Sequence, residues 1–377
     1  MFSFFKAKSP EAKSNSFLAF SNLGNPVWTP RDYGALAREG YRQNPIAYRC
    51  VRMIAEAVAA IPLLVKDKDG KPHAWQNLID KPNFEQTTSE LLEAFIGHLQ
   101  IAGNAYIEVV AVDNIPKELI ILRPDTMRII KGQNGWIIGW EQQIGNNKRR
   151  LWRDMVTGRS QVLHLKTFNP CDDLYGQSPI EPAATAIDIH NAGGAWNKAL
   201  IDNAARPSGA LVYRGQNGVE RLSDEQFERL KAELTIAHTG ATNAGRPLLL
   251  EGGLEWSPMS LSPQEMDFVE ARRQASRDIA LAFGVPPMLL GIPGDNTYSN
   301  YKEANSAFYR QTIIPLVNKL SAALAGLLNG WSSEPVFITA NFDAVNALGT
   351  ERDGLWARLE NATFLSDSEK RKLAGVE

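Results

Sequence analysis

The sequence predicts an α+β fold in which long helices carry small groups of strands, and three patterns indicate this class. Helix-periodic segments followed by a meander of short strands fill residues 40–170. Two long helical segments, residues 181–204 and 263–283, lead out to a small α/β segment and back again. A third helix follows, and Pro315 near its middle is expected to kink it, because proline lacks the N–H that the helix needs.

The composition limits the classes of function. The chain has 377 residues, of which 44% are apolar and 22% charged, and its formal net charge is -2. This length allows two or three domains. The charge argues against tight nucleic-acid binding, because proteins that grip phosphates are usually basic. Two cysteines, Cys50 and Cys171, cannot build a disulfide framework, so we expect both to be buried thiols in a reducing compartment.

The N-terminal residues predict a flexible arm. The apolar start of "MFSFFKAKSPEAKSNS" is too short for the core of a signal peptide. No run of the sequence approaches the roughly 20 apolar residues that span a bilayer. We therefore expect a soluble, cytosolic-type protein in which residues 1–39 are flexible.

Residues 40–180 are predicted to hold the helices and the meander. The first helix covers about residues 44–60, has apolar residues at helical spacing and stops before Pro62. Thr87 and Glu90 predict a capping box that opens the next helix. Strands are expected in "NAYIEVVAV", "ELIILRPDTMRII", "GWIIGWEQQI" and "QVLHLKTF".

Residues 181–290 are predicted to form two helices around an excursion. In "EPAATAIDIHNAGGAWNKALIDNA" the pair Gly193-Gly194 indicates either a kink or close packing against a neighbour. The strands "GALVYRG" and "RPLLLEGGLEWSPMSL" flank a helix that opens at Ser223. The second long helix is charged over half its circumference and stops at "VPPMLLG", because Pro286 and Pro287 cannot continue it.

The segment "GIPGDNTYSN" that follows is small, polar and rich in glycine. We expect the next helix to be capped by Asn300 and Glu303 and to run to about Leu328, with a packed leucine stripe in its second half. "PVFITANF" then predicts a strand, and a short capped helix from Ser366 closes the sequence.

Recognisable catalytic and metal-binding motifs are absent from the sequence. It contains no G-x-x-x-x-G-K-[ST], G-x-S-x-G, H-E-x-x-H or C-x-x-C. The five histidines are spread over different elements, so we interpret His98 and His164 as structural residues. Asp172 and Asp173 are interpreted as a solvated turn rather than a cation site, and "NKRR" at 147–150 as the end of a hairpin in solvent. No enzyme activity, cofactor or metal site is expected.

Six segments together carry a resemblance to a known family. They are "NPIAYRCVRMIAEAVAAIPL", "GNAYIEVV", "LRPDTM", "YGQSPIEPA", "GRPLLLEGGLEWSPMSLSPQEMDF" and "IALAFGVPPMLLG". In this order they make the chain resemble the portal proteins of long-tailed phages, prophages and gene transfer agents over about residues 40–345. The resemblance implies a ring of typically twelve subunits at one capsid vertex, through which DNA enters and leaves. It implies a place in the virion, and in the host cytoplasm during assembly.

The same resemblance implies a division of the chain into the parts of a portal subunit. These are a wing at 40–180, a stem helix at 181–204, a clip at 205–262, a second stem helix with its proline hinge at 263–290, a tunnel loop at 291–300, a kinked helix and wing strand at 301–345, and a crown at 346–377 that ends unusually early.

Four sets of residues receive a role from this resemblance. The tunnel loop that meets DNA would contain Gly291, Gly294, Asp295, Asn296, Thr297, Tyr298, Ser299 and Asn300. The hinge would contain Val285, Pro286, Pro287 and Pro315. Stem contacts between subunits would use Glu270, Arg272, Arg273, Arg277 and Asp278. Docking of terminase or adaptor at the clip would use Arg214, Glu220, Arg221, Glu228 and Lys231.

The implied partners are further copies of the chain, the large terminase, a head–tail adaptor, the major capsid protein and double-stranded DNA, with no membrane. The DNA contact is expected to be weak and non-specific, since Asp295 and its neutral polar neighbours avoid strong phosphate attachment. Two other classes stay open. One is a scaffold or adaptor protein of a phage-like particle, and the other is an enzyme in which residues 291–300 form a mobile lid.

Overall fold

The computed structural model describes residues 32–202, 209–213, 225, 228–229, 254–258, 268–293 and 298–374. Its first elements are the short helix α1 (Tyr33–Ala35) and a π-helical turn, η1 (Leu36–Arg42). The prediction of a flexible arm up to residue 39 is therefore wrong for residues 32–39. Asp32 caps α1 by accepting a hydrogen bond from Ala35 N at 2.9 Å, and Leu36 is buried in the main core.

Two helices form where the sequence predicts them, α2 (Pro45–Ala59) and α4 (Thr88–Ala102), and they pack against each other. Asn44 caps α2, and its carbonyl Oδ1 accepts hydrogen bonds from Ile46 N and Ala47 N, both at 3.0 Å. The capping box of Thr87 and Glu90 opens α4. Between the two helices lie the strand β1 (Leu63–Lys66) and the short helix α3 (Gln76–Asp80).

The strands that follow form two three-stranded antiparallel sheets instead of one meander. A 3-10 turn, η2 (Pro124–Thr126), carries the chain from the first sheet to the second. The later strand β7 then returns to pair with β2, Asn104 opposite Lys166. In spatial order, one sheet holds β3 (Ile115–Leu122), β2 (Asn104–Val112) and β7 (Val162–Lys166), and the other holds β4 (Met127–Lys131), β5 (Ile137–Ile144) and β6 (Asn147–Trp152).

The segment "NKRR" forms the start of β6, directly after the turn that joins β5 to β6, and its four residues are exposed as predicted. Its charges form cross-strand pairs, because Lys148 and Arg150 each lie 3.4 Å from the carboxylate of Glu141 on β5. Arg149 reaches back to the other sheet and donates to both carboxylate oxygens of the buried Glu108, at 2.8 and 2.5 Å. This bidentate pair ties the two sheets together.

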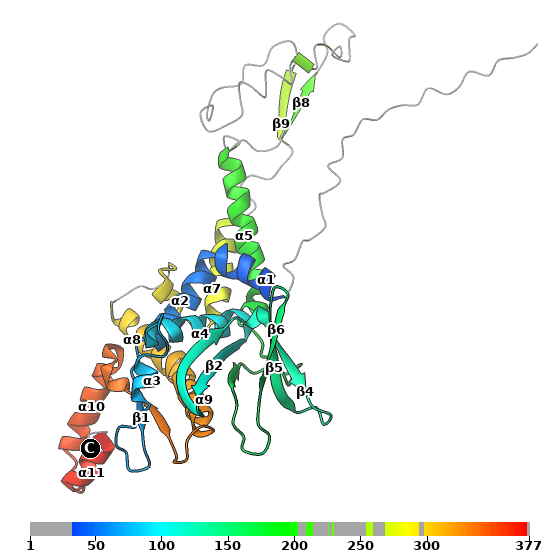
Figure 1. Ribbon diagram of the computed structural model, residues 1–377. Helices are drawn as coiled ribbons and strands as arrows, with labels where there is room; N and C mark the ends of the chain where they lie inside the picture. Colours follow the sequence, from blue (N-terminus) through cyan, green and yellow to red (C-terminus); the bar gives the residue numbers. More distant parts are fainter. Residues whose placement is uncertain are drawn as a thin grey trace, which may run out of the picture.

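Helix α5 (Ile180–Asp202) leaves the sheets and runs beside α7 (Phe268–Ala282). In Figure 1 the green α5 extends away from the rest of the fold, and the hairpin of β8 (Gly209–Tyr213) and β9 (Leu254–Pro258) lies beyond its far end. Both strands occur where the sequence predicts them, and they pair antiparallel with Gly209 opposite Pro258.

The last third of the chain is mainly helical. After the 3-10 turn η4 (Pro287–Leu290) come α8 (Tyr298–Phe308), the π-helical turn η5 (Tyr309–Ile313) and α9 (Ile314–Asn329). The helix therefore changes its hydrogen-bonding pattern in the turn before Pro315, where a proline cannot donate. The remaining elements are β10 (Phe337–Ala340), the 3-10 turns η6 (Phe342–Ala344) and η7 (Asn346–Leu348), and the helices α10 (Gly349–Glu360) and α11 (Asp367–Ala374).

One main core joins elements that are far apart in the sequence. It contains the buried faces of α2, α4, β2 and α9, and the leucine stripe of α9 is packed there as predicted. β10 pairs antiparallel with β1, Leu63 opposite Ala340, so a strand from the last third of the chain joins one from the first third. A smaller core, which includes Tyr106, Trp140 and Leu151, lies between the two three-stranded sheets.

Two expectations about apolar residues need correction. Within the described residues, the helical run Ser299–Asn329 is long and apolar enough to meet the criteria for a membrane-spanning helix, although no such run was expected. Its buried residues, among them Val317, Leu320 and Leu324, pack into the main core, which accounts for its apolar character. Cys50 is buried, but Cys171 is exposed, because it lies in a turn after β7.

Candidate functional site

The helix pair α5–α7 is joined by an arginine that lies against a glycine. A Cβ atom on Gly193 would lie 2.9 Å from Cγ and 3.1 Å from Cδ of Arg272 on α7. The aliphatic part of Arg272 therefore occupies the space that a side chain on Gly193 would need. Of the two alternatives for Gly193-Gly194, the structure supports close packing.

Polar side chains extend this contact from α5 to the start of α2. His190 and Asn44 are buried, and Asn44 Nδ2 lies 3.3 Å from His190 Nδ1 and donates to Asn191 Oδ1 at 3.0 Å. Burial lowers the pKa of His190, and the nearby Arg272 cation lowers it further. An uncharged His190 can therefore accept the hydrogen bond from Asn44 and lie close to Arg272 without repulsion.

The N-terminus of α5 is fixed to the β2–β7 sheet by a close backbone contact. Gly176 N donates to Asn104 Oδ1 at 2.8 Å, and Thr167 N donates to Gly103 O at 2.9 Å. A Cβ atom on Gly176 would overlap Gly103 O and lie 2.7 Å from Thr167 N. The two glycines therefore allow the chain before α5 to touch the end of α4, which sets where α5 begins.

His164 also takes part in this contact between the end of α4 and the chain before α5, which is called the His164 junction below. Its Nε2 lies 2.9 Å from Asn104 Oδ1, which can only accept, so Nε2 carries the proton. Its ring stacks on Tyr106 with 4.4 Å between centroids. His98 has a comparable partner, because Tyr33 Oη lies 3.3 Å from its Nδ1. Both histidines are structural, as predicted from the sequence.

The His164 junction predicts an acid-dependent loss of stability. Burial, with a smaller contribution from Lys166, lowers the pKa of His164 to about 4. The unfolded chain, with an ordinary histidine pKa near 6.5, binds this proton first, so stability falls as the pH drops from about 6.5 to 4. We expect His164→Gln, which keeps an N–H donor but does not titrate, to lose less stability over this window, by up to about 1.4 kcal/mol per pH unit. Urea unfolding at several pH values measures how the free energy of unfolding changes with pH. Equal slopes for the original chain and for His164→Gln contradict the expectation.

The turn after α7 is held by backbone and side-chain contacts on both sides. Gly284 ends the helix with a φ of 65°, and its carbonyl accepts from Thr312 Oγ1 at 2.7 Å. Val285 is buried, and Pro287 starts the 3-10 turn η4. Gly291 then adopts a φ of 72°. This part of the chain is stiff, because two prolines and several hydrogen bonds fix it.

One arginine of α7 also holds the chain that follows η4. Arg277 Nη2 donates to Pro293 O at 2.7 Å. Of the predicted loop residues, Gly291, Ser299 and Asn300 are exposed, whereas Gly294, Asp295, Asn296 and Thr297 lie outside the described residues. α8 starts at Tyr298, so Asn300 and Glu303 are already inside the helix and the predicted capping box is wrong. A cap must have a non-helical backbone, and spacing alone does not reveal that.

The charged residues predicted for contacts between subunits are partly engaged within this chain. Arg273 Nη1 lies 3.5 Å from Glu270 Oε2, and Gln274 Nε2 donates to Asp278 Oδ1 at 2.9 Å. Arg272 is half-buried against α5, and its Nε has no hydrogen-bond partner. Three large apolar side chains are exposed at separate points along the helix pair: Ile189 on α5, and Val269 and Leu281 near the two ends of α7.

Most of the predicted clip residues cannot be placed. Glu228 is helical and exposed, whereas Arg214, Glu220, Arg221 and Lys231 lie outside the described residues. In the described part of the chain, no group of three His, Cys, Asp or Glu side chains could hold a metal ion. Asp172 Oδ1 accepts hydrogen bonds from Leu174 N at 2.7 Å and Tyr175 N at 3.2 Å, which supports a turn.

A sequence profile of the family described as phage portal protein matches residues 45–375. The chain belongs to the phage portal protein family. Over 342 residues, this portal protein is 41% identical to an uncharacterized protein of Rickettsia bellii, and the match covers 90% of this chain and 88% of the relative. Over 381 residues it is 26% identical to the probable portal protein of Streptomyces phage phiC31, covering 93% and 81%.

Solved structures agree with this assignment. A chain in the neck of an empty GTA particle, computed with C6 symmetry, matches the portal protein with a TM-score of 0.74 at 49% identity, covering 95% of this chain and 97% of that chain. The neck of a native GTA particle, computed with C12 symmetry, matches with a TM-score of 0.72 at the same identity and coverage. GTA stands for gene transfer agent.

Sequence reasoning placed the start of α5 to within one residue, at 181, but missed the capping box that precedes it in this portal protein. Ser178 and Glu181 form a capping box, since Ile180 N donates to Ser178 Oγ at 3.0 Å and Ser178 N donates to Glu181 Oε1 at 3.2 Å. The signal is present as S-P-I-E in "YGQSPIEPA". The bonds from Asn104 to Gly176 and from Arg277 to Pro293 have no such local signal.

Proposed function

We propose that this portal protein assembles into a ring of twelve subunits at one vertex of a phage-like or gene transfer agent particle. The observation that carries the proposal is the likeness to chains in GTA necks, at 49% identity over 95% of this chain. One of these necks was computed with C12 symmetry, which supports the number of subunits. A place in the virion, with assembly in the host cytoplasm, follows from the same likeness.

The helix pair α5–α7 is the proposed stem, in which subunits contact each other around the ring. Ile189, Val269 and Leu281 are exposed on this pair, and Leu281 is 78% exposed. A neighbouring subunit would remove such apolar surface from water, which favours assembly. Glu270, Arg273 and Asp278 are exposed on α7 and would pair in part with charges of the next subunit.

Residues 291–300 are the proposed tunnel loop, through which the ring contacts passing DNA. The chain that leads into the proposed loop is held by Arg277 at Pro293 and by the turn at Gly284, which supports a loop that begins at the same place in each subunit. Asp295 and its polar neighbours carry no positive charge, which suits a channel that lets DNA slide. The DNA contact is therefore weak and non-specific.

The remaining partners, which are the large terminase, the head–tail adaptor and the major capsid protein, are assigned to the clip and the wing at the two ends of the proposed stem. The segment 205–262 is the proposed clip, where the large terminase and later a head–tail adaptor dock. Residues 40–180, with β10, are the proposed wing, which faces the major capsid protein. The family is a structural one, so an enzyme with a lid loop is not favoured. A scaffold protein outside the portal family is not favoured either, because the family profile covers residues 45–375.

Positive charge in the loop is expected to make the ring bind DNA more tightly and to block movement of the DNA. Asp295→Lys with Asn296→Lys removes one negative charge and adds two positive charges per subunit. Each lysine that pairs with a phosphate releases counterions and steepens the salt dependence of DNA affinity by about 0.9 in log–log slope. We expect rings to assemble normally, bind DNA more tightly at low salt, and package several-fold less DNA per particle.

The matched control places the same change on the exposed turn between β2 and β3, as Asp113→Lys with Asn114→Lys. Both residues have a positive φ, of 51° and 61°, so thermal unfolding must show that the control still folds. DNA per particle at equal ring yield is the measurement. Normal packaging by the loop variant would mean that the loop does not contact the DNA.

A further inference from the structure

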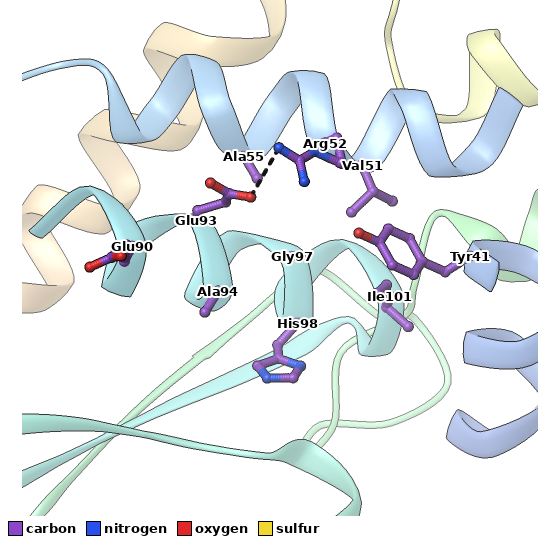
Figure 2. Close-up of a pocket in the computed structure, with 10 residues that line it drawn as sticks. All are labelled: Tyr41, Val51, Arg52, Ala55, Glu90, Glu93, Ala94, Gly97, His98 and Ile101. Atoms are coloured by element: carbon purple, nitrogen blue, oxygen red, sulfur yellow. Dashed lines mark ion pairs between the residues drawn. The ribbon is translucent and has the colours of Figure 1, made fainter. Parts of the chain in front are cut away.

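An open groove lies between α2 and α4, on the part of the fold where the described chain begins. It has a volume of about 390 Å³ and is closed at one end by Tyr41 of η1. Its apolar lining includes Val51 and Ile101. Figure 2 shows Arg52 of α2 extending toward Glu93 of α4, with Gly97 in the middle of α4 between Glu93 and Ile101.

Gly97 keeps this groove open at a cost to the helix. A Cβ atom on Gly97 would meet no other atom within 4 Å, so packing within the subunit does not require glycine there. A glycine inside a helix is less favourable than alanine by about 1 kcal/mol. The residue therefore disfavours α4 and leaves space above it, as expected where another chain segment approaches closely.

The charges at the groove favour a partner that carries positive charge and apolar side chains. Arg52 is bound to Glu56 and lies 3.5 Å from Glu93. Glu90 also lines the groove and accepts a hydrogen bond from Thr87 N at 2.8 Å. Two carboxylates line the groove, Glu90 and Glu93, and they outnumber the single guanidinium there, that of Arg52, which is also bound to Glu56.

We propose that the groove binds residues 25–31, "NPVWTPR", of the same subunit, with Trp28 over Gly97. The described chain begins at Asp32, and the next residue, Tyr33, lies 3.3 Å through its hydroxyl from Nδ1 of His98, which lines the groove. Trp28 is four residues before Asp32, so an extended chain reaches about 14 Å back from that point. The groove is therefore within reach of this segment without help from another subunit.

The composition of the segment fits the groove. Val27 and Trp28 supply apolar surface, and Arg31 supplies the positive charge that the carboxylates favour. Pro26 and Pro30 restrict the free segment, which lowers the entropy lost on binding. Because the segment is tethered beside the groove, its effective concentration there is high, about millimolar or more. Docking would fix the chain in front of α1 and cover Gly97.

Photo-crosslinking of the full-length chain tests this docking. p-Benzoylphenylalanine replaces Trp28, and the irradiated protein is digested and mapped by mass spectrometry. Crosslinks are expected in peptides of η1, α2 and α4, in a band with the mass of one chain. Crosslinks confined to other elements overturn the proposal, and a two-chain band with the same groove peptides overturns docking within the subunit.

Two variants separate groove binding from chance proximity. Gly97→Leu fills the groove and is expected to lower the groove crosslinks by about tenfold or more, because the tethered segment loses its site. Gly354→Leu, at another helix glycine with no neighbour within 4 Å, is the matched control and is expected to leave them unchanged. Equal crosslinking in all three proteins overturns the proposal.

Limited trypsin cleavage without the crosslinker gives a second readout. Cleavage after Arg31 is expected to be slow relative to cleavage after Lys8 and Lys13, and Gly97→Leu is expected to speed only the cut after Arg31. If Gly97→Leu leaves the rate of cleavage after Arg31 unchanged, the result contradicts docking. Circular dichroism of each variant confirms folding before the comparison.

Discussion

Replacing Gly176 with valine is expected to lower the stability of the fold by about 4 kcal/mol or more, the range reached by severe backbone and core disruptions. The new Cβ would overlap Gly103 O and lie 2.7 Å from both Thr167 N and Oγ1. Most of these atoms belong to the backbone, which cannot move aside without losing the Thr167–Gly103 hydrogen bond at 2.9 Å and the Gly176–Asn104 bond at 2.8 Å.

Urea unfolding and the yield of soluble protein measure this effect. Gly326→Ala is the matched control, because Gly326 lies inside α9 and a Cβ there meets nothing within 4 Å. We expect the control to be neutral or more stable than the original chain, since alanine favours helices. A Gly176→Val protein with an unchanged urea midpoint would mean that the contact between Gly103 and Gly176 does not hold α5 in place.

Replacing Gly193 with leucine is expected to separate α5 from α7 and to prevent ring formation while leaving the sheets folded. The added side chain would need the space that Cγ and Cδ of Arg272 occupy, at 2.9 and 3.1 Å. Overpacking of this kind typically costs about 1–3 kcal/mol. In the proposed stem the displacement would also change the surface that each subunit presents to the next.

Light scattering measures the loss of ring formation, and circular dichroism shows whether the rest of the subunit stays folded. Gly194→Ala is the control, because its Cβ would lie 3.9 Å from Arg272 Nη2, an ordinary contact. Adding Arg272→Ala to Gly193→Leu is expected to restore part of the assembly, since it frees the occupied space. Rings formed normally by Gly193→Leu alone would exclude a role for this contact in assembly.

Local chemistry made several elements predictable. The capping box of Thr87 and Glu90 places the start of α4, and Pro286 with Pro287 ends α7 where expected. In these places the residues that decide the structure lie within one helical turn of each other. The Gly193-Gly194 pair indicated either a kink or a close contact, but nothing in its own sequence identified Arg272 as the partner, about 80 residues later.

Contacts between distant residues account for the errors. "NKRR" lies at the exposed end of a hairpin as predicted, but the sequence did not indicate that its charges pair with Glu141 and Glu108 on other strands. The expected single meander was wrong because β7, which follows the second sheet in the sequence, pairs with β2 of the first sheet, and no local pattern indicates that pairing. In the site, the sequence indicated the proline hinge but not the Arg277–Pro293 and Thr312–Gly284 bonds that fix it. The residues proposed to meet DNA, Asp295 and Asn296, rest on the family likeness and stay predictions.

End-on electron microscopy of the purified full-length protein tests the proposed ring most directly. The chain has a mass of 41.7 kDa, so twelve copies give a particle of roughly 500 kDa. We expect rings with a central hole and twelve-fold symmetry, with the helix pair α5–α7 of each subunit packed against that of its neighbour. A folded protein that remains a monomer or dimer, or a particle of this mass without a central hole, would contradict the proposed portal channel.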